Sequence, residues 1–95
     1  MNATETVRAG QGTIVDVRSP EEFAAGHNEG AVNIPLPEII HRMEDVQSMK
    51  QPLLLVCASG NRSGMAAMML SREGLDVMNA GGWYDFESKL KAAAV

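Results

Sequence analysis

Five consecutive apolar residues, Leu53 to Cys57, run straight into small and polar residues and constrain the fold more than any other feature. An uninterrupted run of Leu and Val is typical of a strand buried on both faces, as strands in parallel sheets are. The segment at 62–73 that follows the loop favours a helix. The pattern therefore predicts a strand, a loop and a helix, with Cys57 at the carboxyl end of the strand. Open α/β sheets bind their ligands at this place.

Strands and helices alternate along the rest of the chain. Ser19 and Pro20 have the residue types of an N-cap and a first helical position, and Gly26 ends that short helix. Extended segments are further predicted at 13–17, 30–35 and 75–80, and helices at 20–25, 36–46 and 81–94. The first dozen residues carry no strong pattern. Alternation with short connections predicts an α/β fold of three layers, with a small central parallel β-sheet and helices on both faces.

Length and composition narrow the classes of protein that fit. A chain of 95 residues is expected to form one domain over 1–95. With 12 acidic and 8 basic residues and no basic tract, nucleic acid is not an expected partner. One cysteine cannot form an internal disulfide, and no apolar stretch is long enough for a signal peptide or a membrane span. Composition therefore predicts a cytoplasmic protein with no membrane partner.

Cys57 is open to two interpretations. On position alone it is a small core hydrophobe, because free cysteines are among the most buried residue types. The four residues at 58–61, ASGN, favour the second interpretation, since small residues that tolerate a left-handed backbone let successive N–H groups converge on an anion. A thiolate in such a loop is stabilised by the start of the next helix and by Arg62, and a lowered pKa makes it a nucleophile.

Two blocks of the chain also match a known family pattern in their order and spacing. The first, IVDVRSPEEFAAGHNEGAVNIP, contains the D-V-R sequence of Asp16 to Arg18, and the second, LLLVCASGNRSGMAAMMLSREGLDVMNAGG, contains Cys57. Over residues 13–82 the chain resembles the single-domain rhodaneses, a family of small sulfurtransferases. Two positions depart from the family pattern: 28–29 is Asn-Glu instead of an apolar residue and proline, and Phe86 stands where tryptophan is common.

The resemblance implies an activity and a site. It implies a thiosulfate sulfurtransferase that moves a sulfane sulfur from a small anionic donor to a thiophilic acceptor, cyanide or a thiol, through a persulfide on Cys57. Neither a metal nor a cofactor is required, and a protein acceptor is compatible with the pattern. Beside the catalytic Cys57, the residues expected to bind the donor or the persulfide are Ala58, Ser59, Gly60, Asn61, Arg62, Ser63 and Arg18.

Three of these side chains have structural roles open to them as well. Arg62 either docks the anionic donor or forms an ion pair with a carboxylate such as Asp16 or Glu22. Arg18 is expected to act mainly as a structural brace. The hydroxyl of Ser63 can cap the helix, donate to the loop or reach the sulfur.

Two rival functions remain. Phosphatases and arsenate reductases with a C-x5-R loop also hold a thiolate among backbone amides, but here only four residues separate Cys57 from Arg62. The shorter loop is expected to fit one sulfur atom and to enclose a tetrahedral oxyanion poorly. A non-catalytic docking module, or a carrier that delivers sulfur from protein to protein, is the second rival.

Overall fold

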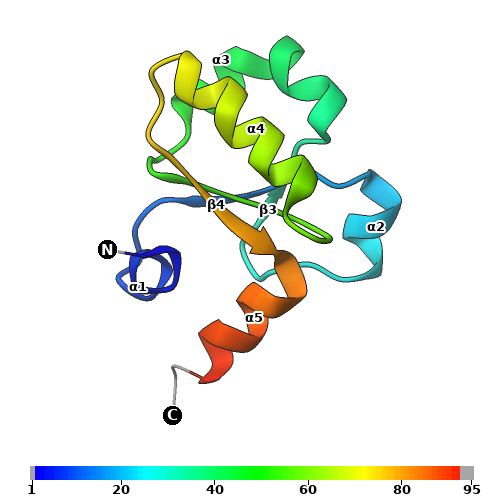
Figure 1. Cartoon of the computed structure of the whole chain (residues 1–95), viewed down its shortest axis with the longest axis vertical. Coiled ribbons are helices and arrows are strands. Elements are labelled where there is room, and N and C mark those ends of the chain that lie inside the picture. The colour runs from blue at the N-terminus through cyan, green and yellow to red at the C-terminus, as the bar shows by residue number, and fades with distance from the viewer. Residues whose placement is uncertain (1, 93–95) are drawn as a thin grey trace.

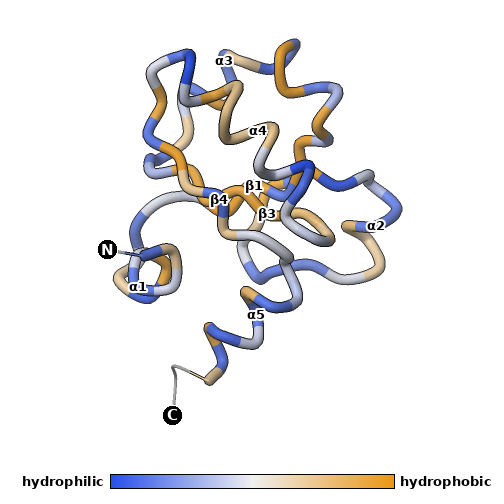
Figure 2. Tube along the Cα trace, in the orientation of Figure 1, coloured by the Kyte–Doolittle hydropathy of each residue, from blue (hydrophilic) through white to orange (hydrophobic). Residues whose placement is uncertain are grey.

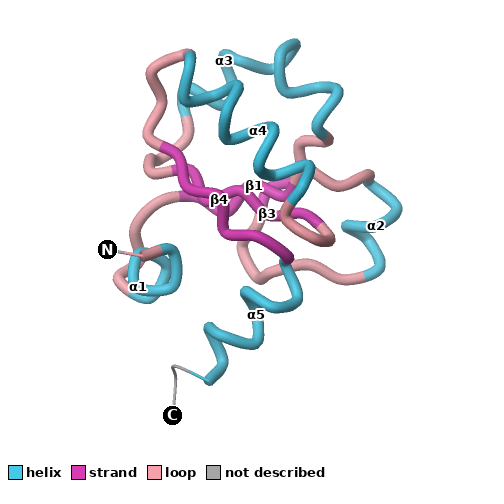
Figure 3. Tube along the Cα trace, in the orientation of Figure 1, coloured by secondary structure: helices cyan, strands magenta, loops and turns pink. Residues whose placement is uncertain are grey.

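The computed structural model of the chain describes residues 2–92. Among them, four strands form a sheet in the order β2-β1-β3-β4, and each neighbouring pair is parallel (Figure 3). The strands are β1 (Thr13–Asp16), β2 (Val32–Asn33), β3 (Leu53–Cys57) and β4 (Val77–Gly82). The predicted small parallel sheet is confirmed, although β2 is shorter than the extended segment expected at 30–35.

Helices cover both faces of the sheet, as predicted. They are α1 (Ala3–Arg8), α2 (Pro20–Ala25), the 3-10 helix η1 (Leu36–Arg42), α3 (Met43–Ser48), α4 (Asn61–Arg72) and α5 (Trp83–Ala92). In the view of Figure 1, α3 and α4 lie above the sheet and α1 and α5 below it. None of the helices described between residues 2 and 92 has the length and hydrophobicity needed to cross a lipid bilayer.

The central strand β3 divides its side chains between two cores. All five of its residues have no exposed surface. Leu53, Leu55 and Cys57 join the core under η1, α3 and α4, whereas Leu54 and Val56 join the core that contains Phe86 of α5. This alternation follows from the two-residue period of a strand, and it explains why the whole run is apolar. Figure 2 shows the hydrophobic colour concentrated at this centre. The side chain of Cys57 therefore points toward α4.

The short helix α2 begins and ends where the sequence predicts. The Ser19 side chain accepts a hydrogen bond from the backbone N–H of Glu22, whose carboxylate accepts in return from the backbone N–H of Ser19. Pro20 occupies the first turn, and Gly26 is the C-cap. A reciprocal cap of this kind contributes about 1 kcal/mol to helix stability. Local chemistry is sufficient to define this element.

The segment at 36–46 differs from the single helix that its apolar spacing predicts. It is a 3-10 helix up to Arg42, where the backbone leaves the helical region at φ −121° and ψ 32°, and α3 follows. Ile39 before the break and Val46 after it both have no exposed surface. Both parts of the segment therefore bury one apolar side chain in the core, although the helix is interrupted between them.

The two ends of the chain also differ from expectation. Residues 3–8 form α1, with a capping box between Asn2 and Glu5 that was missed in the featureless first dozen residues. At the other end, β4 spans 77–82 instead of 75–80, because the N–H of Leu75 still bonds back to the last turn of α4, at the Leu70 carbonyl. Helix α5 accordingly starts at Trp83 and not at residue 81. Its predicted end at 94 lies outside the described residues.

Candidate active site at the carboxyl end of β3

Cys57 is the last residue of β3, and its sulfur lies against polar groups although it is buried. The loop that follows it returns at once, so that the backbone N–H of Gly60 donates to Cys57 Sγ at 2.9 Å. Ser63 Oγ, in the first turn of α4, lies 3.3 Å from the same sulfur. A cysteine that served only as a core hydrophobe would lack such contacts. The loop therefore brings polar groups to the sulfur, and its role as an anion cradle stays a prediction.

These donors change the ionisation of the thiol. Burial raises the pKa of Cys57, whereas the hydroxyl and backbone N–H of Ser63 lower it, as do the backbone N–H groups of Gly60 and Ser59. The hydrogen bonds outweigh burial, so the pKa of the thiol lies below its ordinary value. The start of the 12-residue helix α4 adds its partial positive charge at the same place. The result favours a thiolate, which is the nucleophilic form.

Two glycines make this tight loop possible. Gly60, just before α4, has φ +97°, a left-handed conformation that residues with a side chain rarely adopt. Gly82 lies on the neighbouring strand β4, where it pairs with Cys57 of β3. A Cβ on Gly82 would lie 2.8 Å from the carbonyl oxygen of Ala58, closer than real Cβ contacts come. Gly82, at the end of β4, thus leaves room for the cysteine loop.

Arg62 forms the ion pair that the sequence left open, and Glu22 is its partner. Its guanidinium donates to both carboxylate oxygens of Glu22, at 2.7 and 3.0 Å, and each side chain is a little over one-third exposed. The Arg62 hydrogen bond, followed by the bond from the Ser19 backbone, lowers the pKa of Glu22 to about 2. The Glu22 carboxylate in turn raises the pKa of Arg62. Docking of an anionic donor by Arg62 stays a prediction.

Arg18 has the contacts expected of a structural brace. Only 4% of its surface is exposed, and its Nε and Nη2 donate to the fully buried carboxylate of Asp16. Nη2 also donates to the carbonyl of Gly26, and the guanidinium carbon lies 4.7 Å from the centroid of the Trp83 ring. Arg18 therefore ties β1 to the end of α2 and the start of α5. A direct contact between Arg18 and the donor stays a prediction.

The structure places the predicted site residues in three groups. Ser59, Gly60 and Ser63 direct hydrogen bonds at the sulfur of Cys57. Ala58 in the loop and Asn61, the first residue of α4, are both exposed. Arg62 and Arg18 are held by carboxylates, Glu22 and Asp16 respectively.

One residue of the site was missed by reasoning from the sequence. Asn79 of β4 accepts a hydrogen bond from Ser63 Oγ at 2.7 Å, and its Nδ2 donates to the Gly60 carbonyl at 3.2 Å. The only signal for it was a polar residue near the end of the extended segment predicted at 75–80. Its partners are 16 and 19 positions away in the sequence, so no local pattern could indicate them.

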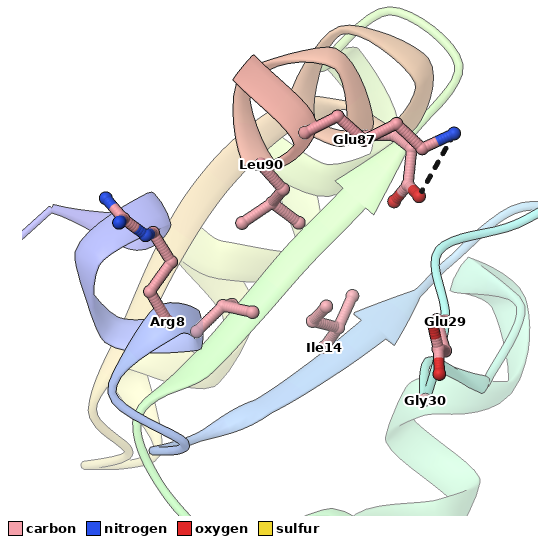
Figure 4. Close-up of a pocket in the computed structure, with 8 residues that line it drawn as sticks. Arg8, Ile14, Glu29, Gly30, Glu87 and Leu90 are labelled. Atoms are coloured by element: carbon pink, nitrogen blue, oxygen red, sulfur yellow. Dashed lines mark ion pairs between the residues drawn. The ribbon is translucent and has the colours of Figure 1, made fainter. Parts of the chain in front are cut away.

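A separate pocket lies across the sheet from the cysteine. It is formed between α1 and α5, with Arg8, Ile14, Glu87 and Leu90 among its lining residues (Figure 4). Glu87 pairs with Lys91, which also lines the pocket. Ile14 belongs to the core on the α1 and α5 side, whereas Cys57 belongs to the other core. The pocket is therefore not part of the sulfur site. Within residues 2–92, no cluster of three or more His, Cys, Asp or Glu is placed to hold a metal ion.

Comparison with known proteins agrees with this geometry. The family model for the rhodanese-like domain matches residues 2–89. The chain is 39% identical over 92 residues to the uncharacterized protein YqhL of Bacillus subtilis (strain 168), covering 93% of this chain and 72% of that protein. It is 41% identical over 73 residues to the thiosulfate sulfurtransferase PspE of Escherichia coli (strain K12), covering 75% and 70%.

A solved structure shows the same fold. The rhodanese-related protein of Thermoplasma volcanium superposes with a TM-score of 0.75 at 30% identity, over 90% of this chain and 82% of that one. The family match extends over nearly the whole chain and includes the cysteine loop at the end of β3. The chain therefore belongs to the rhodanese-like family.

Proposed function

We propose that this protein is a sulfurtransferase that carries a sulfane sulfur as a persulfide on Cys57. The Cys57 thiolate attacks the outer sulfur of a donor such as thiosulfate. A new S–S bond forms, the donor's own S–S bond breaks, and sulfite leaves with the electron pair. Cyanide or a thiolate then attacks the terminal sulfur, and the Cys57 thiolate is regenerated as its leaving group.

The observation that carries the proposal is the 2.9 Å hydrogen bond from the Gly60 N–H to Cys57 Sγ, at the start of α4. Backbone donors that already point at the sulfur need no rearrangement when negative charge develops there. In the persulfide, the charge moves one atom outward, toward the mouth of a loop whose N–H groups converge. The same donors then stabilise the terminal sulfur.

The position of Arg62 supports sulfur transfer over phosphate chemistry. In a C-x5-R loop, the arginine belongs to the anion cradle itself. Here Nη1 and Nη2 of Arg62 both donate to the Glu22 carboxylate. Four residues between Cys57 and Arg62 leave a cradle of backbone donors suited to one sulfur atom.

The test is intact-mass spectrometry after incubation with thiosulfate, without reductant. We expect a gain of one sulfur on Cys57, which cyanide removes with formation of thiocyanate. The matched control is Cys57→Ser, which has no thiol and should gain nothing. A parent protein that gains no sulfur from thiosulfate, a persulfidated thiol or 3-mercaptopyruvate would overturn the proposal and favour the docking module.

A further inference from the structure

The hydroxyl of Ser63 lies between two acceptors that compete for its single proton. Ser63 Oγ is 3.3 Å from Cys57 Sγ and 2.7 Å from Asn79 Oδ1. Ser63 and Cys57 have no exposed surface, whereas Asn79 is exposed to solvent. A hydroxyl carries one proton and donates one hydrogen bond at a time.

The orientation of the Asn79 amide is determined by its other contacts. Its Nδ2 donates to the Gly60 carbonyl at 3.2 Å, and its Oδ1 accepts from the Gly81 N–H at 3.0 Å. The atom that faces Ser63 is therefore the carbonyl oxygen, which only accepts. The short contact of 2.7 Å consequently requires the Ser63 hydroxyl to donate to Asn79. In that state, Ser63 presents a lone pair to the sulfur and accepts from the protonated thiol.

We propose that Asn79 is a positioning residue that acts on Cys57 through Ser63. Asn79 withholds the Ser63 hydroxyl from the sulfur while the thiol is protonated. When the sulfur ionises, the hydroxyl turns to it and the bond to Asn79 is lost. Asn79 thus opposes ionisation of Cys57, while its bond to the Gly60 carbonyl keeps the loop in place. The catalytic consequence rests on the proposed function, in which Cys57 is the nucleophile.

The charged groups around Cys57 lie on elements other than β4, the strand that carries Asn79. Arg62 at the start of α4 interacts electrostatically with Cys57 and with Asp16 of β1, and it pairs with Glu22 of α2. Asp16 is itself neutralised by Arg18. Strand β4, which carries Asn79, contains no charged residue. Substitution of Asn79 by a neutral residue therefore changes the hydrogen bonds at the sulfur without changing the local charge.

The experiment is a double-mutant cycle read by the ultraviolet absorbance of the thiolate as pH is raised. Cys57 is the only cysteine, so subtraction of the same titration in the matching Cys57→Ser protein isolates its signal. The four proteins are the parent, Asn79→Ala, Ser63→Ala and the double variant. Substitution of Asn79 removes its bond to the Gly60 carbonyl whether or not Ser63 is present. It releases the Ser63 hydroxyl only in the protein that still has Ser63.

We expect Asn79→Ala to lower the thiolate midpoint by about one pH unit more in the parent than in the Ser63→Ala background, as for one hydrogen bond to a charged acceptor. Equal changes in the two backgrounds would overturn the role of Asn79. Circular dichroism verifies folding, and Asn79→Val, which suits a strand, replaces Asn79→Ala if that variant is unfolded. Thiolate titration needs no sulfur donor, so its result is independent of whether thiosulfate loads Cys57.

Discussion

The guanidinium of Arg62 and the carboxylate of Glu22 are joined by two hydrogen bonds, of 2.7 and 3.0 Å, across 40 positions of the chain. The pair connects the helix that follows the cysteine loop to the first turn of α2. The same carboxylate completes the capping box of α2 with Ser19. Glu22 thus caps the start of α2 and also partly neutralises the positive charge of Arg62, which an anionic donor would meet beside Cys57.

Release of Arg62 from this pair should strengthen binding of an anionic donor. We expect Glu22→Gln to lower the KM for thiosulfate, and Arg62→Ala to raise KM more than it lowers kcat. Steady-state kinetics at constant ionic strength measure both. Glu21→Gln, which removes an exposed carboxylate on the same helix, is the matched control. Equal KM values for the two glutamine variants would mean that the pair has only a structural role.

The pair should also make stability depend on pH in the acid range. The Arg62 hydrogen bond, with help from the Ser19 backbone, lowers the pKa of Glu22 from 4.5 to about 2. The unfolded chain therefore takes up this proton at a higher pH, so the stabilisation is complete above about pH 4.5 and is lost toward pH 2. Urea unfolding of the parent and Glu22→Gln should show a difference that shrinks across this window. A constant difference would contradict the prediction.

Cys57 should produce the corresponding effect on the alkaline side. Burial raises its pKa, but the Ser63, Gly60 and Ser59 hydrogen bonds bring it below the ordinary value of 9.0. Ionisation therefore stabilises the fold as pH rises through the folded-state pKa, and the gain is complete above 9.0. We expect the free energy of unfolding of the parent, relative to Cys57→Ser, to increase with pH. The kcat/KM should rise with the thiolate fraction in the same way, and this rise should be complete below pH 9.0.

Gly82→Ala should damage the site more than the fold. The added Cβ would lie 2.8 Å from the backbone oxygen of Ala58, so the cysteine loop must move. Such overpacking costs roughly 1–3 kcal/mol of stability. We expect a large fall in kcat for thiosulfate, with the thiolate midpoint raised as donors leave the sulfur. Gly74→Ala, at a strained φ of +84° with nothing within 4 Å of its Cβ, is the control. It should lose stability and keep the parental kcat.

Loop length is the feature that separates this site from a C-x5-R loop. Insertion of a single glycine after Gly60 should widen the cradle and turn the loop toward the longer pattern. Loss of one such donor lowers the rate by about a hundredfold to a thousandfold in comparable oxyanion sites, and sulfur transfer should fall accordingly. Phosphate or arsenate should inhibit the variant better than the parent, once circular dichroism shows that it is folded. Unchanged transfer and unchanged inhibition would show that loop length does not discriminate.

Local chemistry determined much of this protein from the sequence alone. The apolar run ending at Cys57 specified a strand buried on both faces, and Ser19 with Pro20 specified the start of α2. Small residues after the cysteine indicated a loop that converges on an anion. Each of these features depends on residues within a few positions of one another, where hydrogen-bonding and steric preferences act directly.

Only the tertiary structure decided which distant groups meet at the sulfur. The sequence allowed either Glu22 or Asp16 as the partner of Arg62. The position of α2 beside α4 selects Glu22. Asn79 reaches Ser63 because β4 lies next to β3, with a register shift between Leu55 and Val56 that sets Gly81 opposite Val56 and Gly82 opposite Cys57. The structure likewise interrupts, at Arg42, a helix that local spacing favours over 36–46. Sheet order, register and core packing arise from contacts between remote segments, and no local preference encodes them.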